Sequence, residues 1–460
     1  MKQEFTVKQG NTKLILIFAG WGMDSNPFRE IRLDGYDIAV VWDYRDMQLD
    51  TSPFAVYSDI YLFAWSFGVY TAARTLAATE LSPTVKIAVN GSLNPIDDNE
   101  GIPTAIFQGT LDNLSERNLD KFYRRMCKNS ADFAEFDSHR PRRDLTELKD
   151  ELSAIAAMAA EKGSPIVTDW NRAVISGNDL IFPVENLRRS WNIIPRTREI
   201  PAGSHLPDWQ SVIEQEIIDK SLVAQRFSRS ATTYDAHADV QRHIAEKLWS
   251  LWSNITTRQP LSILEAGYGT GMLTRLYTSQ WHPYRISLWD LAPIDIELPE
   301  AGDIVAGDAE ELIRIMPEGY YEAIASASAL QWFDSPERWL RNAARTLTPG
   351  GIIAISTFGP DNMREIAEVT KLPLRYYTAS ELSAMTPDGC RLMAIEEEHI
   401  VKEFDSPRDV LTHMKLTGVN AMRHSMTSAK ELIAGYPITD GKARLTYHPI
   451  YLIIKKEENE

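Results

Sequence analysis

The chain has 460 residues, 44% of them hydrophobic and 24% charged, with a formal net charge of −16. This composition excludes disordered and fibrous proteins, and at roughly 150 residues per domain the length predicts two or three domains. Neither the first 220 residues nor the remainder is basic, which argues against a nucleic-acid partner.

The sequence shows no feature of a membrane or secreted protein. No uncharged apolar run is long enough to cross a bilayer, and the N-terminus has no apolar signal region. The two cysteines, Cys127 and Cys390, are too few for a disulfide framework or a structural zinc site. We therefore expect a cytoplasmic protein without a metal.

Strand and helix signals alternate in the first half. Continuous apolar runs bounded by turn residues predict strands, and an Ala-, Leu- and Thr-rich segment at 67–78 predicts a helix. The predicted strands are 14–19, 37–42, 59–65, 86–90, 104–108, 172–176 and 198–200. This alternation predicts an α/β fold with a parallel sheet. Strand signals stop between 113 and 161, so a helical insertion, or lid, is expected at about 112–162.

A candidate nucleophile lies at residues 64–68 (AWSFG), after an apolar strand and before a helix. α/β-Hydrolases place their serine on such a sharp strand-to-helix turn, flanked by small residues. Ala64 stands where glycine is usual, and Gly68 fits the pattern. On these five residues alone, a nucleophilic Ser66 and an ordinary serine at a strand end are equally compatible.

Two further residues complete a catalytic triad in the expected chain order of serine, acid and histidine. His205 lies in a loop after the last predicted strand, where the fold delivers its base. Asp179 follows an earlier strand and would hold the imidazole tautomer. Taken singly, Asp179 also suits a turn and His205 a surface loop. Together with Ser66 they predict an acyl-enzyme mechanism.

The oxyanion of such a reaction needs two backbone N–H donors. One comes from the residue after the nucleophile, Phe67. The loop after the first strand offers the amide of Trp21, which lies between Gly20 and Gly22. Glycines on both sides allow that backbone to approach the substrate closely.

Most of residues 1–215 resembles the pimeloyl-acyl-carrier-protein methyl ester esterases of biotin synthesis, of the shorter type. The segments that carry the resemblance are 18–24, 65–68, 90–91, 95–98, 101–103 and 122–126. The resemblance implies an α/β-hydrolase that removes the methyl group from a carrier-bound pimeloyl methyl ester. Ser66 and His205 lie in matching motifs, whereas the motif around Asp179 is short.

The second half begins where a helix from 208 to about 220 should end. We expect domains at 1–220 and 221–460. Four strands are predicted in the second half, at 262–264, 285–288, 323–327 and 351–357. This second alternating pattern predicts another α/β domain, of Rossmann-like type.

A glycine-rich turn follows the first of these strands, in the order Glu265, Gly267, Gly269, Gly271. A dinucleotide phosphate would favour G-x-G-x-x-G, whereas the spacing here is G-x-G-x-G. S-adenosylmethionine carries no phosphate and must approach bare backbone, so this spacing favours a methyl-donor pocket. A glycine-rich loop alone is weak evidence.

Acidic residues follow the next two strand regions. Asp290 ends the second strand and is placed to accept hydrogen bonds from ribose hydroxyls. Asp308 is placed to accept from the adenine amino group, and the Ala309 amide to meet a ring nitrogen. Each carboxylate by itself is more often a solvated loop residue.

Residues 221–456 resemble class I S-adenosylmethionine-dependent methyltransferases, and among them the malonyl-acyl-carrier-protein O-methyltransferase of biotin synthesis. The segments that carry this resemblance are 226–235, 238–241, 329–332 and 357–362, with Glu365. A carboxylate nucleophile is already ionised, so no catalytic base is expected and positioning is the enzyme's task. Tyr234 either covers the substrate or cofactor or packs as an ordinary helix aromatic.

Together the two resemblances imply the first and last steps of one sequence. Methylation would mask the malonyl carboxylate during chain extension, and the esterase would restore it. The implied partner is an acyl carrier protein, loaded with a malonyl or a methyl-pimeloyl group. The candidate docking residues are Arg124, Arg125, Arg142 and Arg143, although an ordinary solvated surface fits them equally.

Other functions stay open for each half. The first half could be a thioesterase or an inactive carrier-binding module, and the second could methylate a small free acid.

Overall fold

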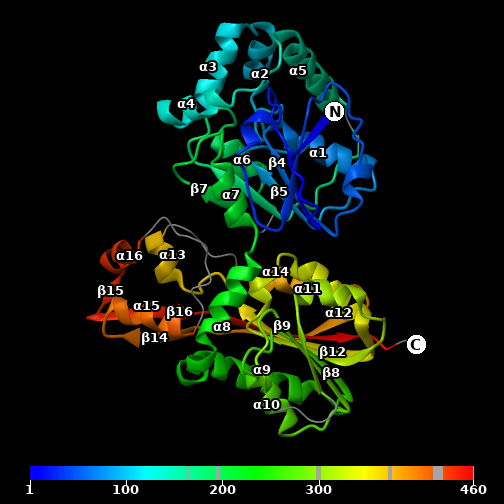
Figure 1. Ribbon diagram of the computed structural model, residues 1–460, viewed down its shortest axis with the longest axis vertical. Coiled ribbons are helices and arrows are strands. Elements are labelled where there is room, and N and C mark those ends of the chain that lie inside the picture. The colour runs from blue at the N-terminus through cyan, green and yellow to red at the C-terminus, as the bar shows by residue number, and fades with distance from the viewer. Residues whose placement is uncertain are drawn as a thin grey trace. The chain divides into compact units, whose positions relative to one another are not determined.

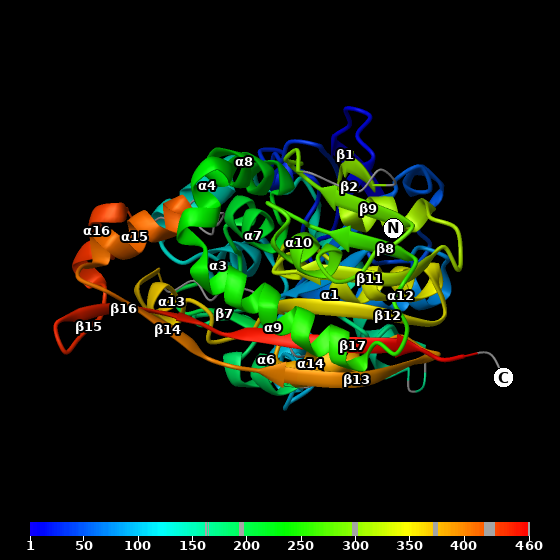
Figure 2. The same ribbon diagram turned by 90° about the horizontal axis from the view of Figure 1, so that it is seen from below.

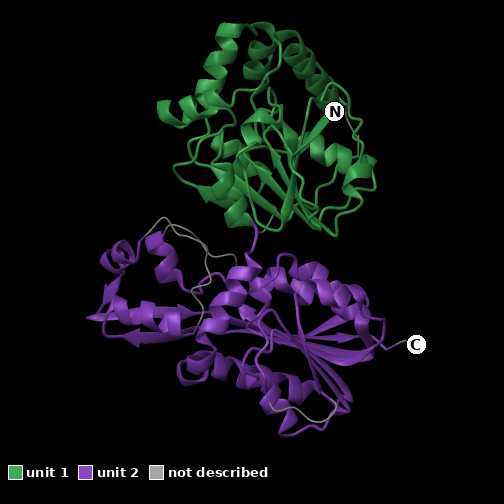
Figure 3. Cartoon of the chain, in the orientation of Figure 1, with its two compact units in different colours: residues 1–216 green, residues 217–460 purple. Residues whose placement is uncertain are grey.

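The computed structural model describes residues 1–161, 163, 165–192, 197–296, 302–370, 376–417 and 428–458. The chain forms two compact units, Met1–Glu216 and Ile217–Glu460 (Figure 3). The division lies at 216/217 rather than 220/221. The reason is that the helix expected to reach Lys220 ends at Glu216, and a separate helix begins at Lys220.

A seven-stranded sheet forms the centre of the first unit (Figure 1). Its order is β1-β3-β2-β4-β5-β6-β7, and every neighbouring pair except β1–β3 is parallel. The strands are β1 Lys2–Val7, β2 Lys13–Phe18, β3 Tyr36–Trp42, β4 Asp59–Trp65, β5 Val85–Val89, β6 Arg172–Ser176 and β7 Thr197–Ile200. The residues of β2 to β6 are almost all buried. This burial explains their continuous apolar runs, because a parallel sheet is covered on both faces.

Helices flank this sheet, and four of them form an insertion between β5 and β6 (Figure 1). The flanking helices are α1 Phe67–Ala78, α6 Val184–Ser190 and α7 Trp209–Glu216, with short turns η1 Asn26–Phe28 and η2 Ser52–Phe54. The insertion comprises α2 Thr104–Asp112, α3 Glu116–Met126, α4 Ser130–Ser138 and α5 Leu145–Ala160.

The strand predicted at 104–108 is wrong, because that segment opens α2. Pro103 precedes the helix, and Asp98 Oδ1 accepts a hydrogen bond from the Thr104 amide at 2.8 Å. Of the α2 residues, Phe107 is buried. A short apolar run does not distinguish a strand from a helix, and here the start of the helix is stabilised by a carboxylate six positions earlier.

A buried ion-pair network holds the insertion on the sheet. The Arg143 guanidinium lies 2.6 Å from Glu151 of α5 and 3.4 Å from Asp43, which follows β3. Glu151 also accepts a hydrogen bond of 2.8 Å from the Tyr44 amide. The Arg143 and Glu151 side chains are 3% and 0% exposed. Each charge therefore depends on its partner, because a single buried charge is costly.

A second seven-stranded sheet runs through the second unit. Its order is β10-β9-β8-β11-β12-β17-β13. The first five strands in this order are parallel, and β17 lies antiparallel between β12 and β13 (Figure 2). The strands are β8 Ser262–Ala266, β9 Arg285–Asp290, β10 Gly302–Ala306, β11 Tyr321–Ala327, β12 Leu347–Phe358, β13 Cys390–Glu397 and β17 Pro449–Lys456. The chain order reverses between β8 and β11. A reversal of this kind places a ligand site at the carboxyl ends of these strands.

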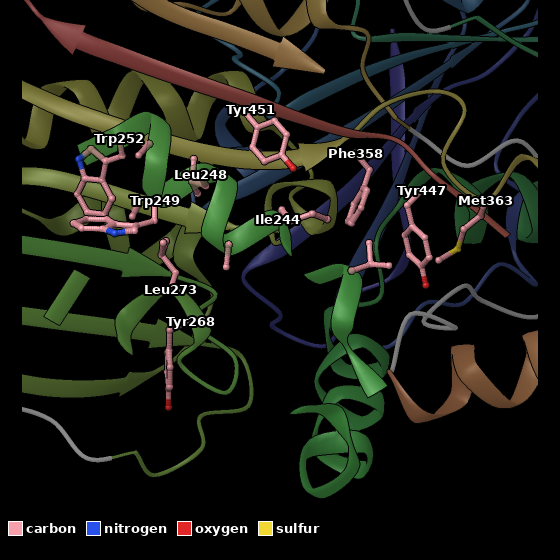
Figure 4. Packing of buried hydrophobic residues seen from close by; sticks show 14 of the residues in the cluster. Ile244, Leu248, Trp249, Trp252, Tyr268, Leu273, Phe358, Met363, Tyr447 and Tyr451 are labelled. Carbon is pink, nitrogen blue, oxygen red and sulfur yellow. The ribbon is translucent and has the colours of Figure 1, made fainter. Parts of the chain in front are cut away.

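The helices of the second unit surround this sheet and the smaller sheet described below (Figure 1). They are α8 Lys220–His237, α9 Asp239–Ile255, α10 Met272–Thr278, α11 Ala309–Leu312, α12 Pro336–Thr346, α13 Arg364–Thr370, α14 Ala379–Ala384, α15 Pro407–Leu416 and α16 Ala429–Gly435, with short turns η3 Ile313–Ile315 and η4 Leu330–Trp332. Figure 4 shows the core on one face, where Leu248, Trp249 and Trp252 of α9 pack near Leu273.

A small antiparallel sheet was not predicted from the sequence. It consists of β14 Ile400–Phe404, β16 Lys442–Tyr447 and β15 Ile438–Thr439, in that order. Among the described helices of both units, none has the length and apolar character that a membrane span requires.

The buried network predicts a large stability effect at Arg143. Replacing it in Arg143→Met should lower the unfolding free energy of the first unit by about 3–5 kcal/mol, because Glu151 is left buried without its partner. Calorimetry should show the first unit melting lower, by on the order of 10 °C. The control Arg142→Met changes an exposed neighbour and should leave the transition within about 2 °C. Equal melting temperatures of the two variants would contradict the stabilising role assigned to the buried Arg143 network.

Candidate functional site

Ser66 lies on a sharp turn between β4 and α1. Its backbone angles are φ 58° and ψ −127°, a conformation that is costly for a residue with a side chain. Two glycines make the turn possible: a Cβ on Gly68 would lie 2.3 Å from the Phe18 carbonyl oxygen, and one on Gly91 would lie 2.2 Å from that of Ser66. Ala64 is fully buried in β4 and is accommodated in place of the usual glycine.

The structure brings together the three side chains of the predicted triad. His205 Nε2 lies 3.1 Å from Ser66 Oγ, and His205 Nδ1 lies 2.7 Å from Asp179 Oδ2. All three residues are buried, at 3%, 1% and 6% exposure for Ser66, His205 and Asp179. This geometry allows the imidazole to take the serine proton while the carboxylate stabilises the resulting imidazolium.

Neighbouring groups hold the acid and the base in place. Asp179 Oδ1 accepts hydrogen bonds from the amides of Ile181 and Phe182, at 2.8 and 2.9 Å. The Phe182 ring lies parallel to the His205 ring, with centroids 5.9 Å apart and an interplanar angle of 10°. Rotation of the imidazole is therefore restricted on one side.

Asn90 is a further supporting residue, to which the sequence analysis gave no role. Its amide nitrogen donates to the His205 carbonyl oxygen at 2.9 Å and to Ser176 Oγ at 2.9 Å, and its oxygen accepts from the Ser176 amide at 2.8 Å. Asn90 also has a positive φ of 46°. The sequence signal for this positive φ is the Asn-Gly pair at 90–91, because asparagine tolerates the left-handed conformation.

The loop proposed to supply one oxyanion donor lies against the nucleophile. A Cβ on Gly20 would lie 3.2 Å from that of Ser66, which places the neighbouring Trp21 backbone close to the serine. The Trp21 side chain donates from Nε1 to the Leu148 carbonyl oxygen of α5, at 2.9 Å. The Phe67 ring packs against Phe107 of α2. Both oxyanion candidates are thus in contact with the insertion.

The second unit contains a pocket at the point where the strand order reverses. It encloses about 1060 Å³ of space not filled by protein atoms, part of it open to solvent. Tyr234 and six of the seven predicted cofactor residues line it, namely Glu265, Gly267, Gly269, Asp290, Asp308 and Ala309. One face of α8 covers the pocket with Lys220, Val223, Ala224, Phe227, Ala231 and Tyr234.

The glycine-rich turn follows β8, as predicted. Gly267 and Gly269 have positive φ angles of 69° and 55°, and a Cβ on Gly267 would lie 2.3 Å from that of Ala329. These two positions expose bare backbone to the pocket. Gly271 differs, because it lies outside the pocket lining and is the N-cap residue of α10, with a φ of 80°.

Two acidic residues of the pocket are held by groups of the same unit. Glu265 accepts a hydrogen bond of 2.7 Å from Thr274 Oγ1, and its burial raises its pKa to about 7. Asp290 accepts from the amides of Gly269 and Ala292, at 3.0 and 2.9 Å, and its burial raises its pKa. Both positions fit an electropositive or hydroxyl-bearing ligand.

Asp308 has a partner that the sequence analysis did not identify. Lys220 Nζ lies 2.8 and 2.7 Å from the two Asp308 oxygens and 2.5 Å from Glu310 Oε2. Glu310 also accepts from the amides of Asp334 and Ser335, each at 2.8 Å. Lys220 therefore joins the start of α8 to the pocket edge formed by α11. No local pattern signals a pair that lies 88 residues apart.

The predicted docking surface is wrong for Arg143, because its side chain is buried in the network with Glu151. The other three arginines are exposed, although two of them have protein partners. Arg124 pairs with Asp120 at 2.9 Å, and Arg125 donates to the Leu180 carbonyl oxygen at 2.5 Å. Arg142 is exposed and stays a candidate with them.

Asp361, His399 and His448 have ligand atoms within 4.8 Å of one another, close enough for a metal ion. Hydrogen bonds within the protein account for the cluster. His399 Nε2 lies 2.9 Å from Asp361, and His448 Nδ1 accepts from the Asp361 amide at 3.2 Å. His448 Nε2 faces Glu397 at 3.3 Å. A ring nitrogen that accepts a backbone N–H has no lone pair left for a metal.

Comparisons with known proteins match the two units separately. A family model described as "Pimeloyl-ACP methyl esterase BioG" matches residues 1–211, and one described as "Methyltransferase domain" matches residues 236–422. The crystal structure of BioG from Haemophilus influenzae is 36% identical with a TM-score of 0.41, and the match covers 45% of this chain and 94% of that one. The chain is a fusion of a BioG-like α/β unit with a Rossmann-like methyltransferase unit.

Relatives match most of the chain or its second unit. A "Malonyl-[acyl-carrier protein] O-methyltransferase" of Bacteroides fragilis is 38% identical over 460 residues, covering 96% of this chain and 92% of the relative. A protein of the same description from Haemophilus influenzae is 32% identical over 250 residues, covering 52% and 95%. The chain belongs to the malonyl-[acyl-carrier protein] O-methyltransferase family.

The triad geometry predicts that Asp179 controls the reactivity of Ser66. In Asp179→Asn the imidazole should adopt the wrong tautomer, so a fluorophosphonate probe should label Ser66 about 10³–10⁴-fold more slowly. Labelling rates are read by intact-protein mass. The control Asp169→Asn removes a carboxylate that is 79% exposed and should label at the wild-type rate. Equal rates for both variants would rule out Asp179 as the acid.

Proposed function

We propose that the chain catalyses two reactions on acyl groups held by an acyl carrier protein in the cytoplasm. The second unit methylates the free carboxylate of the malonyl-loaded carrier with S-adenosylmethionine. The first unit hydrolyses the methyl ester of the pimeloyl-loaded carrier. The observation that supports the esterase best is the buried, hydrogen-bonded alignment of Ser66, His205 and Asp179.

In the proposed esterase reaction, Ser66 Oγ attacks the ester carbonyl carbon while His205 Nε2 takes the serine proton. The amides of Trp21 and Phe67 stabilise the oxyanion. His205 then gives its proton to the departing methoxide, and methanol leaves an acyl-enzyme. His205 next deprotonates a water molecule, whose attack releases the pimeloyl carboxylate and returns the proton to Ser66.

The pocket of the second unit fits the proposed methyl donor. Bare backbone at Gly267 and Gly269 permits close approach, and Asp290 ends the second strand as ribose recognition requires. S-adenosylmethionine, when bound, supplies an electrophilic methyl group. Glu265, Asp290, Asp308 and Ala309 would hold it. The protein would contribute position: it would hold the ionised acceptor carboxylate in line with that methyl group, under the cover of α8.

The substrate assignment is supported by the family of relatives and by the match of the first unit to a methyl esterase model. The two units would catalyse the first and the last step of one series of reactions. The second would add a methyl ester to a three-carbon acyl group, and the first would remove it from a seven-carbon one. Tyr234 lines the pocket from α8 and is a candidate contact to the acceptor.

Ser66→Ala tests the esterase directly. Incubation of pimeloyl-carrier methyl ester with the wild type should lower the mass of the carrier by one methylene, as methyl ester becomes acid, and Ser66→Ala should leave it unchanged. Intact-mass spectrometry reads the carrier. The control Ser138→Ala changes an exposed serine of α4 and should hydrolyse normally. Release of the whole acyl chain would indicate a thioesterase instead. If the wild type gave no reaction, the first unit would be a carrier-binding module.

The raised pKa of Glu265 predicts pH-dependent cofactor affinity. If the carboxylate of Glu265 faces the cationic donor, binding needs its ionised form. S-adenosylmethionine should therefore bind about tenfold more weakly at pH 6 than at pH 8, because the pKa is about 7. Titration calorimetry at both pH values measures this ratio. In Glu265→Gln, affinity should fall and the pH dependence should disappear. An unchanged pH profile in that variant would assign the effect elsewhere.

A further inference from the structure

We propose that Gln241 of α9 binds a carboxylate inside the methyl-transfer pocket, an inference that rests on the proposed function of that pocket. Gln241 is 5% exposed and is one of the residues that line the pocket. Neither Nε2 nor Oε1 has a hydrogen-bond partner among the described residues. Because a buried amide without partners is costly, its presence in a cavity indicates a ligand that completes its hydrogen bonds.

The charges around the pocket indicate what kind of ligand group this is. Its ionisable carboxyl residues are Glu265, Asp290 and Asp308, and Lys220 is the cation among the lining residues. The Lys220 ammonium is already bound to Asp308 and Glu310. A ligand carboxylate in this pocket therefore needs neutral N–H donors, and a primary amide offers two. A neutral donor also orients a carboxylate without neutralising its charge.

A second buried pair, Tyr447 of β16 and His413 of α15, lies close to Gln241. Tyr447 of β16 lies near enough to interact with the amide, though without hydrogen-bond geometry. Its hydroxyl lies 2.8 Å from Nε2 of His413 on α15. Burial lowers the pKa of His413 to about 4, so the imidazole is neutral near pH 7 and can accept the tyrosine proton. The Tyr447 proton is thus directed to His413, in keeping with the unpartnered oxygen of the Gln241 amide.

A buried apolar core anchors α9 one turn away from Gln241. Figure 4 shows Ile244, one turn further along α9, and Tyr447 on either side of Phe358. The Phe358 and Tyr447 ring centroids are 6.3 Å apart. Gln241 thus lies on a helix anchored by a core that joins α9, the end of β12 and β16. A backbone position held this way need not be ordered further when a ligand binds.

Two bound species could bring the carboxylate, namely the amino-acid end of the methyl donor and the malonyl group that accepts the methyl. Gln241→Met keeps the length of the side chain and removes both donors. It should raise either the Kd for S-adenosylmethionine or the KM for malonyl-carrier by about 10–100-fold. The constant that rises identifies the carboxylate. Gln241→Glu places like charges together and should raise the same constant further.

Thermal unfolding without ligands separates this role from a structural one. Gln241→Met should melt at or above the wild-type temperature, because it replaces an unpartnered buried amide by an apolar group. If Gln241 only supported the fold, the Gln241→Met variant would have a lower melting temperature than the wild type. The control Gln280→Met changes an exposed glutamine of the same unit and should leave the melting temperature, Kd and KM unchanged.

The outcomes distinguish this inference from the function on which it rests. A wild-type chain that binds S-adenosylmethionine and methylates malonyl-carrier, with both Gln241 variants matching it in Kd and KM, would overturn the inference alone. A wild-type chain that neither binds the donor nor methylates the carrier would overturn the proposed function together with the inference.

Discussion

Both candidate sites depend on one constraint of parallel sheets: strands that run in the same direction end at the same edge, so the loops after them meet there. In the first unit, Ser66 follows β4, and the loops after β6 and β7 carry Asp179 and His205. His205 lies 3.1 Å from Ser66 and 2.7 Å from Asp179. In the second unit, the glycine-rich turn follows β8 and Asp290 ends β9. Residues far apart in sequence become neighbours because their strands are parallel.

The partner of a buried charged group decides whether that group serves stability or a site. Arg143 and Glu151 are both buried and neutralise one another, so they hold α5 in place and are unable to meet a partner protein. Glu265 is equally buried, but its partner is a threonine hydroxyl rather than a cation, and burial raises its pKa to about 7. A carboxyl with a pKa shifted toward neutrality in a pocket is typical of a functional site.

The two proposed reactions act in opposite directions on the same chemical group. One chain would then form a methyl ester and also contain a hydrolase for methyl esters, so the hydrolase must discriminate by acyl length. Each methylene in an apolar pocket contributes roughly 1–3 kcal/mol, and four methylenes separate malonyl from pimeloyl. The contacts of Trp21 and Phe67 with the helical insertion, α5 and α2 in particular, would place such discrimination next to Ser66.

The sequence by itself determined the two α/β patterns, the serine turn, the order of Ser66, Asp179 and His205, and the glycine-rich turn after β8. These features are local, since each depends on residues within one strand and its loop. Only the tertiary structure decided that residues 104–108 are helical, that Arg143 is internal, that Lys220 meets Asp308 and that the Gln241 amide lacks partners. Burial and pairing across 88 residues depend on which elements pack together, and no local pattern encodes that packing.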